Sequence, residues 1–171
     1  MDSRLEELKR SLSQSVDGMS TEQLKWHPAE KWCAAEVLEH LYLSYTGTIK
    51  AFEKVIASGE PLVTRPSLKQ RVQTIVAVGF GYLPEGRKAP PGTVPKGLAP
   101  EKVKNEVSEK IDAMDAIITQ CEARFGRATK LLDHSILGPL TAAQWRKFHF
   151  VHGRHHEKQL LRLREGSARM N

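Results

Sequence analysis

The sequence predicts an all-α fold: a four-helix bundle with an irregular excursion between its second and third long helices. Four long segments repeat apolar residues at intervals of three and four, the period of an amphipathic helix. Capping patterns precede several of these segments, and no convincing alternation of polar and apolar residues indicates a strand. With 171 residues, 40% of them hydrophobic, the chain suits one domain over residues 1–171.

The first helix is expected to start at Ser3, which forms a capping-box pattern with Glu6 in "SRLE". Gly18 follows as a stop signal. Residues 19–32 are expected to be a link, because Pro28 blocks a continuous helix there. The apolar stripe of this first helix consists of Leu5, Leu8, Leu12 and Val16.

The second helix is expected over residues 33–58, with Gly59 behind it. Cys33 takes the capping position, where serine would be the stronger cap. Residues 60–99 then break the helical rhythm. A short helix is expected over residues 67–78, whereas "PEGRKAPPGTVPKG" has four prolines and three glycines and must be loop. The buried face of the second helix is expected to consist of Val37, Leu38, Leu41, Tyr45, Ile49, Phe52 and Ile56.

The third helix is expected to start near Pro100, since proline suits the first turn of a helix. Cys121 falls inside its apolar stripe and is interpreted as a core residue. Thr141 and Gln144 form another capping box, which opens a fourth helix that reaches about Arg164. The stripe of the third helix consists of Val103, Val107, Ile111, Met114, Ile118, Cys121 and Phe125.

The net charge of +6 is concentrated in residues 61–99 and 145–171, each of which carries a net +5. Neither segment shows a recognition motif for nucleic acid, so the positive charge indicates a solvated surface or an anion-lined pocket mouth. No apolar run reaches the ~18 residues of a membrane span, and the N-terminus lacks a hydrophobic signal core. No membrane partner and a cytoplasmic location are therefore expected. The basic residues that could attract an anionic co-substrate are Arg65, Lys69, Arg71, Arg87 and Lys88.

Four of the seven histidines lie within "HFVHGRHHEKQL", residues 149–160. Each helical residue advances about 100°, which puts His152 and His156 within about 20° of the midline of the apolar face. Two buried imidazoles are costly unless each is hydrogen-bonded or bound to a cation, so a hydrogen-bonded core pair and a metal site both remain open. His149 also faces inward and is a possible second-shell partner or alternative ligand. His155 lies at the edge of this face.

A third ligand should come from another helix, and His40 is the natural candidate. Ser44 and Gly47 lie on the same edge of that helix, and such small residues leave a gap in which a metal could keep an open coordination position. His27 and His134 fall in link segments and are expected to serve as turn or hydrogen-bonding residues.

These segments resemble a known family. "WHPAEKWCAAEVLEHL" resembles the second-helix signature of the DinB superfamily, and "HGRHHEKQL" resembles its last-helix signature. "DHSILGPLTAAQWRKFHFVHGRHHEKQ" is similar to a branch of uncharacterised function. The resemblance implies a four-helix bundle, a homodimer, and a divalent metal (nickel, zinc or iron) held by His40, His152 and His156. Two departures are Cys33 in place of the usual serine cap and the excursion over residues 60–99.

Better-understood members of that superfamily are metal-dependent transferases or isomerases that use low-molecular-weight thiols. The resemblance therefore implies a metal-dependent enzyme with a small-molecule substrate, a small thiol or a thiol-activated compound, while a hydrolase remains open. A non-catalytic metal-binding bundle and a metal-free interaction module are the alternatives. No catalytic acid or base can be named, because Glu36 and Glu39 flank His40 in sequence but are expected to point elsewhere or to solvent.

Overall fold

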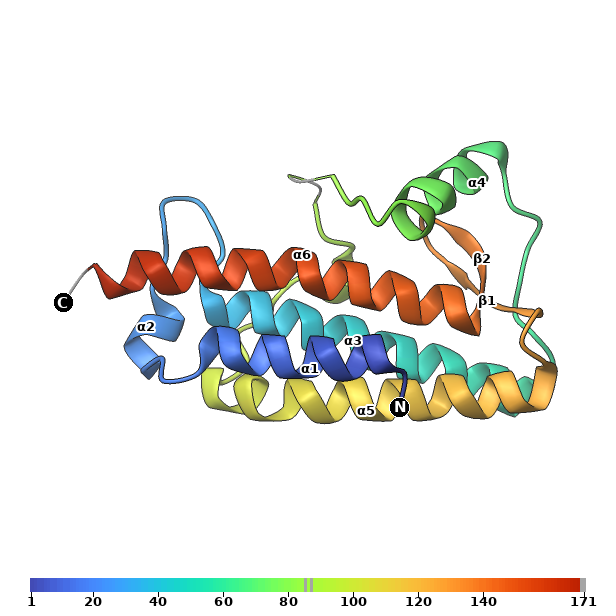
Figure 1. Ribbon diagram of the computed structural model, residues 1–171, viewed down its shortest axis with the longest axis horizontal. Helices are drawn as coiled ribbons and strands as arrows, with labels where there is room; N and C mark the ends of the chain where they lie inside the picture. The colour runs from blue at the N-terminus through green and yellow to red at the C-terminus, as the bar shows by residue number, and fades with distance from the viewer. Residues whose placement is uncertain (85, 87, 170–171) are drawn as a thin grey trace.

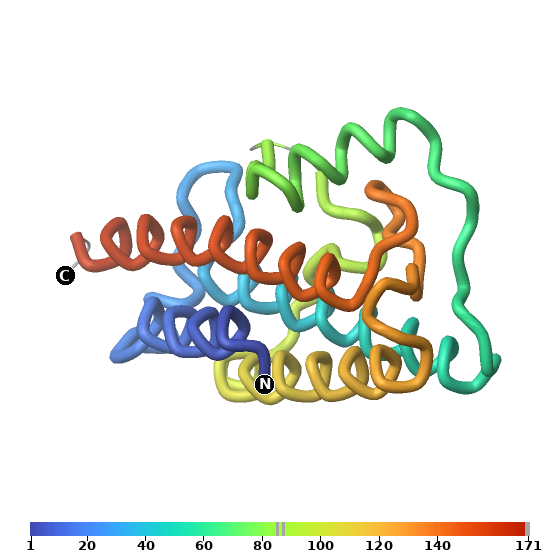
Figure 2. Tube along the Cα trace, turned by 45° about the vertical axis from the view of Figure 1, so that its right-hand side comes forward, coloured from blue at the N-terminus to red at the C-terminus, as the bar shows by residue number. Residues whose placement is uncertain are grey.

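The computed structural model describes residues 1–84, 86 and 88–169 (Figures 1 and 2). The chain is mostly helical, as predicted. The α-helices are α1 (Ser3–Val16), α2 (Thr21–Lys25), α3 (Ala34–Ser58), α4 (Leu68–Thr74), α5 (Pro100–Phe125) and α6 (Ala142–Ala168). A π-helical turn, η1 (Ile75–Gly79), and a 3-10 turn, η2 (Pro91–Thr93), lie between α4 and α5. The strands are β1 (Lys130–His134) and β2 (Gly138–Thr141).

The four longest helices, α1, α3, α5 and α6, lie side by side, with α3 packed on α5 and α1 packed on α6 (Figure 1). Their facing stripes form one core, because the apolar residues of each stripe lose their contact with water against the neighbouring helix. The stripe of α3 is rotated from the predicted one. Ile49 and Ile56 are only half-buried, and Thr48 and Val55 are buried in their place. Thr48 turns inward because its hydroxyl meets His149 of α6.

Capping fixes where most helices begin. Thr141 and Gln144 form the predicted capping box at the start of α6. α1 begins at Ser3 as predicted, but its cap is Asp2, whose carboxylate accepts the Arg4 N–H at 3.0 Å, in place of the predicted capping box of Ser3 with Glu6. The predicted link over residues 19–32 contains α2, capped by Ser20.

The expectation of no strand is wrong. β1 and β2 form an antiparallel hairpin between α5 and α6, with Leu132 opposite Leu140 and His134 opposite Gly138. Burial does not alternate along these strands of five and four residues, so they carry no period-two signal. The chain after α3 returns to this hairpin, where Leu62 N–H donates to the Leu131 carbonyl at 3.0 Å.

Residues 60–99 form the predicted excursion. The short helix expected over 67–78 is α4 continued by η1, and these lie over the α6 side of the molecule (Figure 2). No residue of α4 is buried, so this segment rests on the protein chiefly through Ala77 and Val78 of η1. The described residues between 84 and 97 form loop, apart from η2. Lys88 lines a pocket described below, whereas Arg87 lies outside the described residues. None of the described helices combines the length and the apolar composition needed to cross a bilayer.

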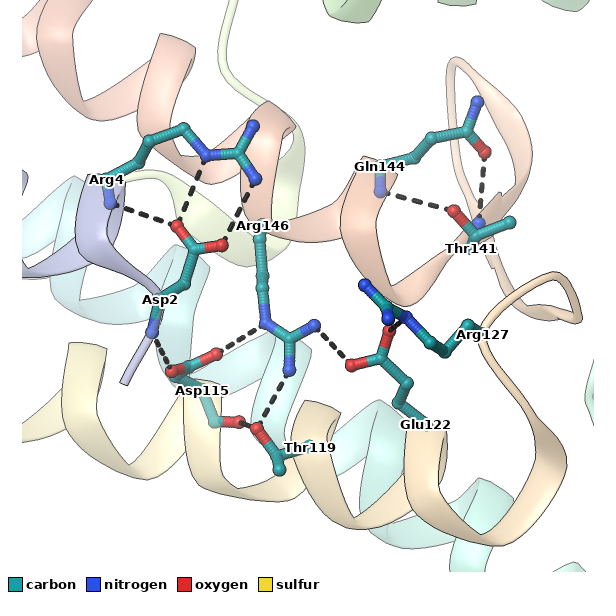
Figure 3. Close-up of polar contacts among 9 residues, drawn as sticks. All are labelled: Asp2, Arg4, Asp115, Thr119, Glu122, Arg127, Thr141, Gln144 and Arg146. Atoms are coloured by element: carbon teal, nitrogen blue, oxygen red, sulfur yellow. Dashed lines mark hydrogen bonds and ion pairs between the residues drawn. The ribbon is translucent and has the colours of Figure 1, made fainter.

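A buried ion-pair network joins α1, α5 and α6 (Figure 3). Arg146 of α6 donates to Asp115 at 2.6 Å, to Glu122 at 2.7 Å and to Thr119 at 2.8 Å. Asp115 also accepts the backbone N–H of Asp2 at 2.8 Å. Burial opposes the charge of Arg146, but the two carboxylates raise the pKa of its guanidinium overall. Arg146 therefore stays charged, and its bonds to α5 set the position of α6 against that helix.

Candidate metal centre

Three histidines from two helices meet at one point of the core. α6 places His152 and His156 one turn apart, and α3 supplies His40. The Nε2 atom of His152 lies 3.2 Å from Nε2 of His40 and 3.2 Å from Nε2 of His156. The ring centroids of His40 and His156 are 4.7 Å apart. The structure thus brings the three predicted residues together, with one ligand atom of each within 4.8 Å of the others.

Hydrogen bonds decide which nitrogen of His40 carries the proton. Its Nδ1 lies 2.8 Å from the carbonyl oxygen of Thr93, which can only accept, so Nδ1 must be the donor. Burial lowers the pKa of His40, and a neutral ring has one N–H. The Nε2 atom of His40 therefore presents a bare lone pair to the other two histidines.

The same reasoning applies to His156. Its Nδ1 lies 3.1 Å from Oε1 of Gln159, one turn further along α6, and burial lowers the pKa of His156 to about 3. With the amide oxygen of Gln159 at this position, Nδ1 is the donor and Nε2 is again a bare lone pair. Burial, together with the neighbouring histidines, holds the pKa of His152 well below its usual value. Because His152 has one N–H in the neutral state, it can satisfy at most one of the two lone pairs that face it.

The spacing of these nitrogens fits one cation. Nitrogens held at about 2.0–2.1 Å from a tetrahedral ion lie about 3.3 Å from one another. The two measured Nε2–Nε2 distances are 3.2 Å. If His152 Nε2 is also a ligand, its proton moves to Nδ1, which is buried without a hydrogen-bond partner among the described residues. The donor set suits a borderline divalent metal, which favours imidazole nitrogen.

Glu39, the residue before His40, holds the loop that carries Thr93. Its carboxylate is 1% exposed and accepts three backbone N–H groups, from Lys96 at 2.7 Å and from Gly97 and Leu98 at 3.0 Å each. As expected, Glu39 points away from the histidine cluster, but it faces this loop and not solvent, because the loop folds back over α3 and offers these donors. Glu39 and His40, adjacent residues of α3, therefore both bind the loop over residues 93–98, and Thr93 of this loop orients the His40 ring.

A pocket of about 560 Å³ opens from the three histidines. Its walls come from α3, η1, the loop before η2, the hairpin and α6, and they are mostly apolar. Ser44 and Gly47 line it, and a Cβ atom built on Gly47 would meet nothing within 4 Å. The gap predicted beside His40 is therefore part of this pocket. Lys88 lines it as well.

The other histidines have different surroundings. His149 faces the core as predicted, but its Nε2 lies 3.0 Å from the Thr48 hydroxyl, and it is not one of the three that converge. His155 is half-buried on the pocket wall. His27 lies with Cys33 and Glu36 at the start of α3 in a second group with ligand-like spacing, but its side chain is 57% exposed.

The comparisons with known proteins give a family without an assigned function. Residues 2–162 match the model of a family described as "Protein of unknown function (DUF1569)". The chain belongs to this family. No curated protein and no solved structure matches it.

All three converging histidines of this DUF1569 chain lie inside the matched range. So do Glu39 and Thr93, whose roles sequence reasoning missed. No signal marked Glu39, because an advance of about 100° per residue puts it on the side of α3 opposite the apolar stripe. Thr93 acts through its backbone carbonyl, so its residue type gave no signal.

Proposed function

We propose that His40, His152 and His156 hold one divalent metal ion, nickel, zinc or iron, within a DinB-like four-helix bundle. The observation that carries this proposal is the tautomer assignment. Thr93 and Gln159 occupy the Nδ1 atoms of two rings, so two Nε2 lone pairs point at the third ring. Without a cation at least one of these lone pairs has no hydrogen donor among the described residues, and a shared cation satisfies all three nitrogens.

We further propose that the centre is catalytic and acts on a small thiol or a thiol-activated substrate. A bound divalent cation would supply a Lewis acid that lowers the pKa of a thiol or of water at neutral pH. The pocket gives a small molecule access to the histidines, which a purely structural site does not need. The ring of Phe148 stacks on that of His152, with centroids 5.5 Å apart, and the Trp32 ring lies 5.2 Å from that of His40, so both aromatic rings pack against the imidazoles.

The scarcity of acidic groups in the pocket favours thiol transfer over hydrolysis. Among the described residues, the lining contains one carboxylate, that of Asp133. Its Oδ2 accepts the backbone N–H and the hydroxyl of Thr64, at 2.9 and 2.6 Å, and its Oδ1 is buried without a partner among the described residues. A thiol, with a pKa of about 8.5 against about 15.7 for water, ionises more readily on a bound cation and so depends less on a nearby general base.

Metal analysis tests the centre. Protein purified without a histidine tag is expected to carry about one divalent metal per chain. His152→Ala and His156→Ala should each abolish metal binding and leave a folded helical protein, while His155→Ala, the matched control on the same helix, should keep its metal. Full occupancy in either of the first two variants contradicts the ligand assignment, and strong loss in His155→Ala moves the ligand set by one position.

A thiol screen tests the catalytic proposal. Metal-loaded protein is mixed with several cellular thiols and an electrophilic acceptor, and thiol consumption is followed with and without a chelator. Metal-dependent loss of one thiol is the expected result. Metal-dependent cleavage of ester or amide substrates without any thiol would instead support the hydrolase alternative.

A further inference from the structure

The pocket contains a fourth histidine, His134, whose proton position is also fixed by the fold. His134 is the last residue of β1, and its Nδ1 accepts the backbone N–H groups of Ile136 and Leu137 at 3.2 Å each. An Nδ1 that accepts two hydrogen bonds carries no proton. The neutral ring therefore has its single N–H on Nε2.

This N–H is free to meet a ligand. Among the described residues, no hydrogen bond is made by Nε2 of His134, and this atom is not one of the buried nitrogens and oxygens without a partner. The ring lines the pocket, and it packs against Trp145, 5.4 Å away, and Phe148, 4.3 Å away. Two backbone bonds and two aromatic rings thus fix the direction of one unused donor.

The position of this donor relative to the histidine cluster indicates what kind of ligand could contact both. Phe148 contacts both imidazoles: its ring centroid lies 4.3 Å from that of His134 and 5.5 Å from that of His152, on which it stacks. A ligand that contacts both imidazoles would therefore run alongside Phe148. The nearby walls include Val76, Ala77 and Leu83, which favour an apolar middle. Burial lowers the pKa of His134 to about 4, so the ring stays neutral and offers a hydrogen bond without a charge.

We propose that His134 is a specificity-determining residue that donates its Nε2–H to a carbonyl oxygen of a largely apolar ligand whose other end lies at His40, His152 and His156. This inference rests on the proposed metal centre and adds to it the class of ligand. An uncharged amide, ester or ketone suits a neutral donor. A carboxylate would leave a charge in an apolar pocket without a cation beside it.

Two substitutions separate the role of His134 in the ligand site from its role in the hairpin. His134→Asn keeps an oxygen at the Nδ1 position, which can accept the N–H groups of Ile136 and Leu137, but removes the Nε2 donor. His134→Gln keeps a donor near the Nε2 position and removes that acceptor. The fold of His134→Asn is checked by its unfolding free energy, and the tautomer of the unsubstituted protein by the ¹⁵N shifts of its histidine rings.

The binding experiment uses cobalt(II)-loaded protein and two series of thiols, with linkers of about two to six methylene groups. One series ends in a primary amide and the other in an isopropyl group of the same shape. At one linker length at least, the amide-to-isopropyl affinity ratio should fall roughly fivefold in His134→Asn, the value of one neutral hydrogen bond, and should be partly kept in His134→Gln.

An amide-to-isopropyl ratio unchanged at every length, or the absence of binding by either series, overturns the inference, as does a ¹⁵N spectrum with the proton on Nδ1 of His134. Cobalt content is measured on the same samples. Loss of cobalt from the unsubstituted protein contradicts the proposed metal centre, whereas full cobalt with an unchanged ratio contradicts the role of His134 alone.

Discussion

Replacing Glu39 by glutamine tests whether the loop over α3 supports the histidine cluster. In the structure Oε1 of Glu39 accepts the N–H of Lys96, and Oε2 accepts those of Gly97 and Leu98. Glutamine keeps one oxygen and puts an NH₂ group in place of the other. At least one of the three backbone N–H groups then faces a donor, and the remaining hydrogen bonds lose their charge assistance.

The expected cost follows from these bonds. An unsatisfied buried N–H costs about 1–3 kcal/mol, and a hydrogen bond to a charged group is worth about 1 kcal/mol more than a neutral one. The relief of burying an amide instead of a carboxylate offsets part of this cost. Glu39→Gln should therefore destabilise the protein or detach the loop by roughly 2–4 kcal/mol. Because the loop orients His40 through Thr93, metal affinity should also fall, by about tenfold.

The assay is amide hydrogen exchange together with urea unfolding. Exchange at Lys96, Gly97 and Leu98 should accelerate strongly in Glu39→Gln. The matched control is Glu36→Gln, one turn earlier on α3. Glu36 accepts a single N–H, from Cys33 at 2.9 Å, and glutamine can still accept it, so the change should cost less than about 1 kcal/mol. Unchanged exchange and unchanged stability in Glu39→Gln would refute the reasoning about the loop.

Three further predictions concern packing, charge and pH. Gly153→Ala brings a Cβ to 2.5 Å from a buried leucine of α1 and should lower the free energy of unfolding by about 1–3 kcal/mol. Gly47→Ala, whose Cβ has nothing within 4 Å, should instead stabilise α3 by up to about 1 kcal/mol. Equal urea midpoints for the two variants would contradict this. Arg146→Met strands two carboxylates and should cost about 3–5 kcal/mol in urea unfolding; a loss below about 1 kcal/mol contradicts it. Burial lowers the pKa of His134 to about 4 and that of His149 to about 3, so the unfolded chain binds more protons than the folded chain below pH ~6.5. As the pH falls from there towards 4, each of these residues should therefore remove about 1.4 kcal/mol of stability per pH unit. His149→Gln should flatten that slope by the same amount, and an unchanged slope contradicts the assignment.

The long helices could be predicted because their signals are local. Proline and the apolar stripe define α5, and Thr141 with Gln144 defines the start of α6. The hairpin could not be predicted, because its strands are short and their buried residues do not alternate with exposed ones. The rotation of the α3 stripe was also invisible in the sequence. It depends on Thr48 meeting His149, a residue 101 positions away along the chain.

The candidate site could also be predicted only in part. The advance of about 100° per helical residue predicts that His152 and His156 face inward together, and a histidine beside small residues on another helix completes the group. The supports of these ligands could not be predicted, because they are backbone groups from a distant loop. Glu39 meets donors 57 to 59 residues away, and His40 meets a carbonyl 53 residues away. Only the folded loop brings these groups together.

X-ray absorption at the edge of the bound metal, on protein purified without a histidine tag, tests the central claim most directly. We predict a first shell that contains three imidazole nitrogens at about 2.0–2.1 Å, and the loss of that shell in His152→Ala. A bound metal whose spectrum lacks imidazole scattering, or a protein that binds no divalent metal with its three histidines intact, would contradict the account.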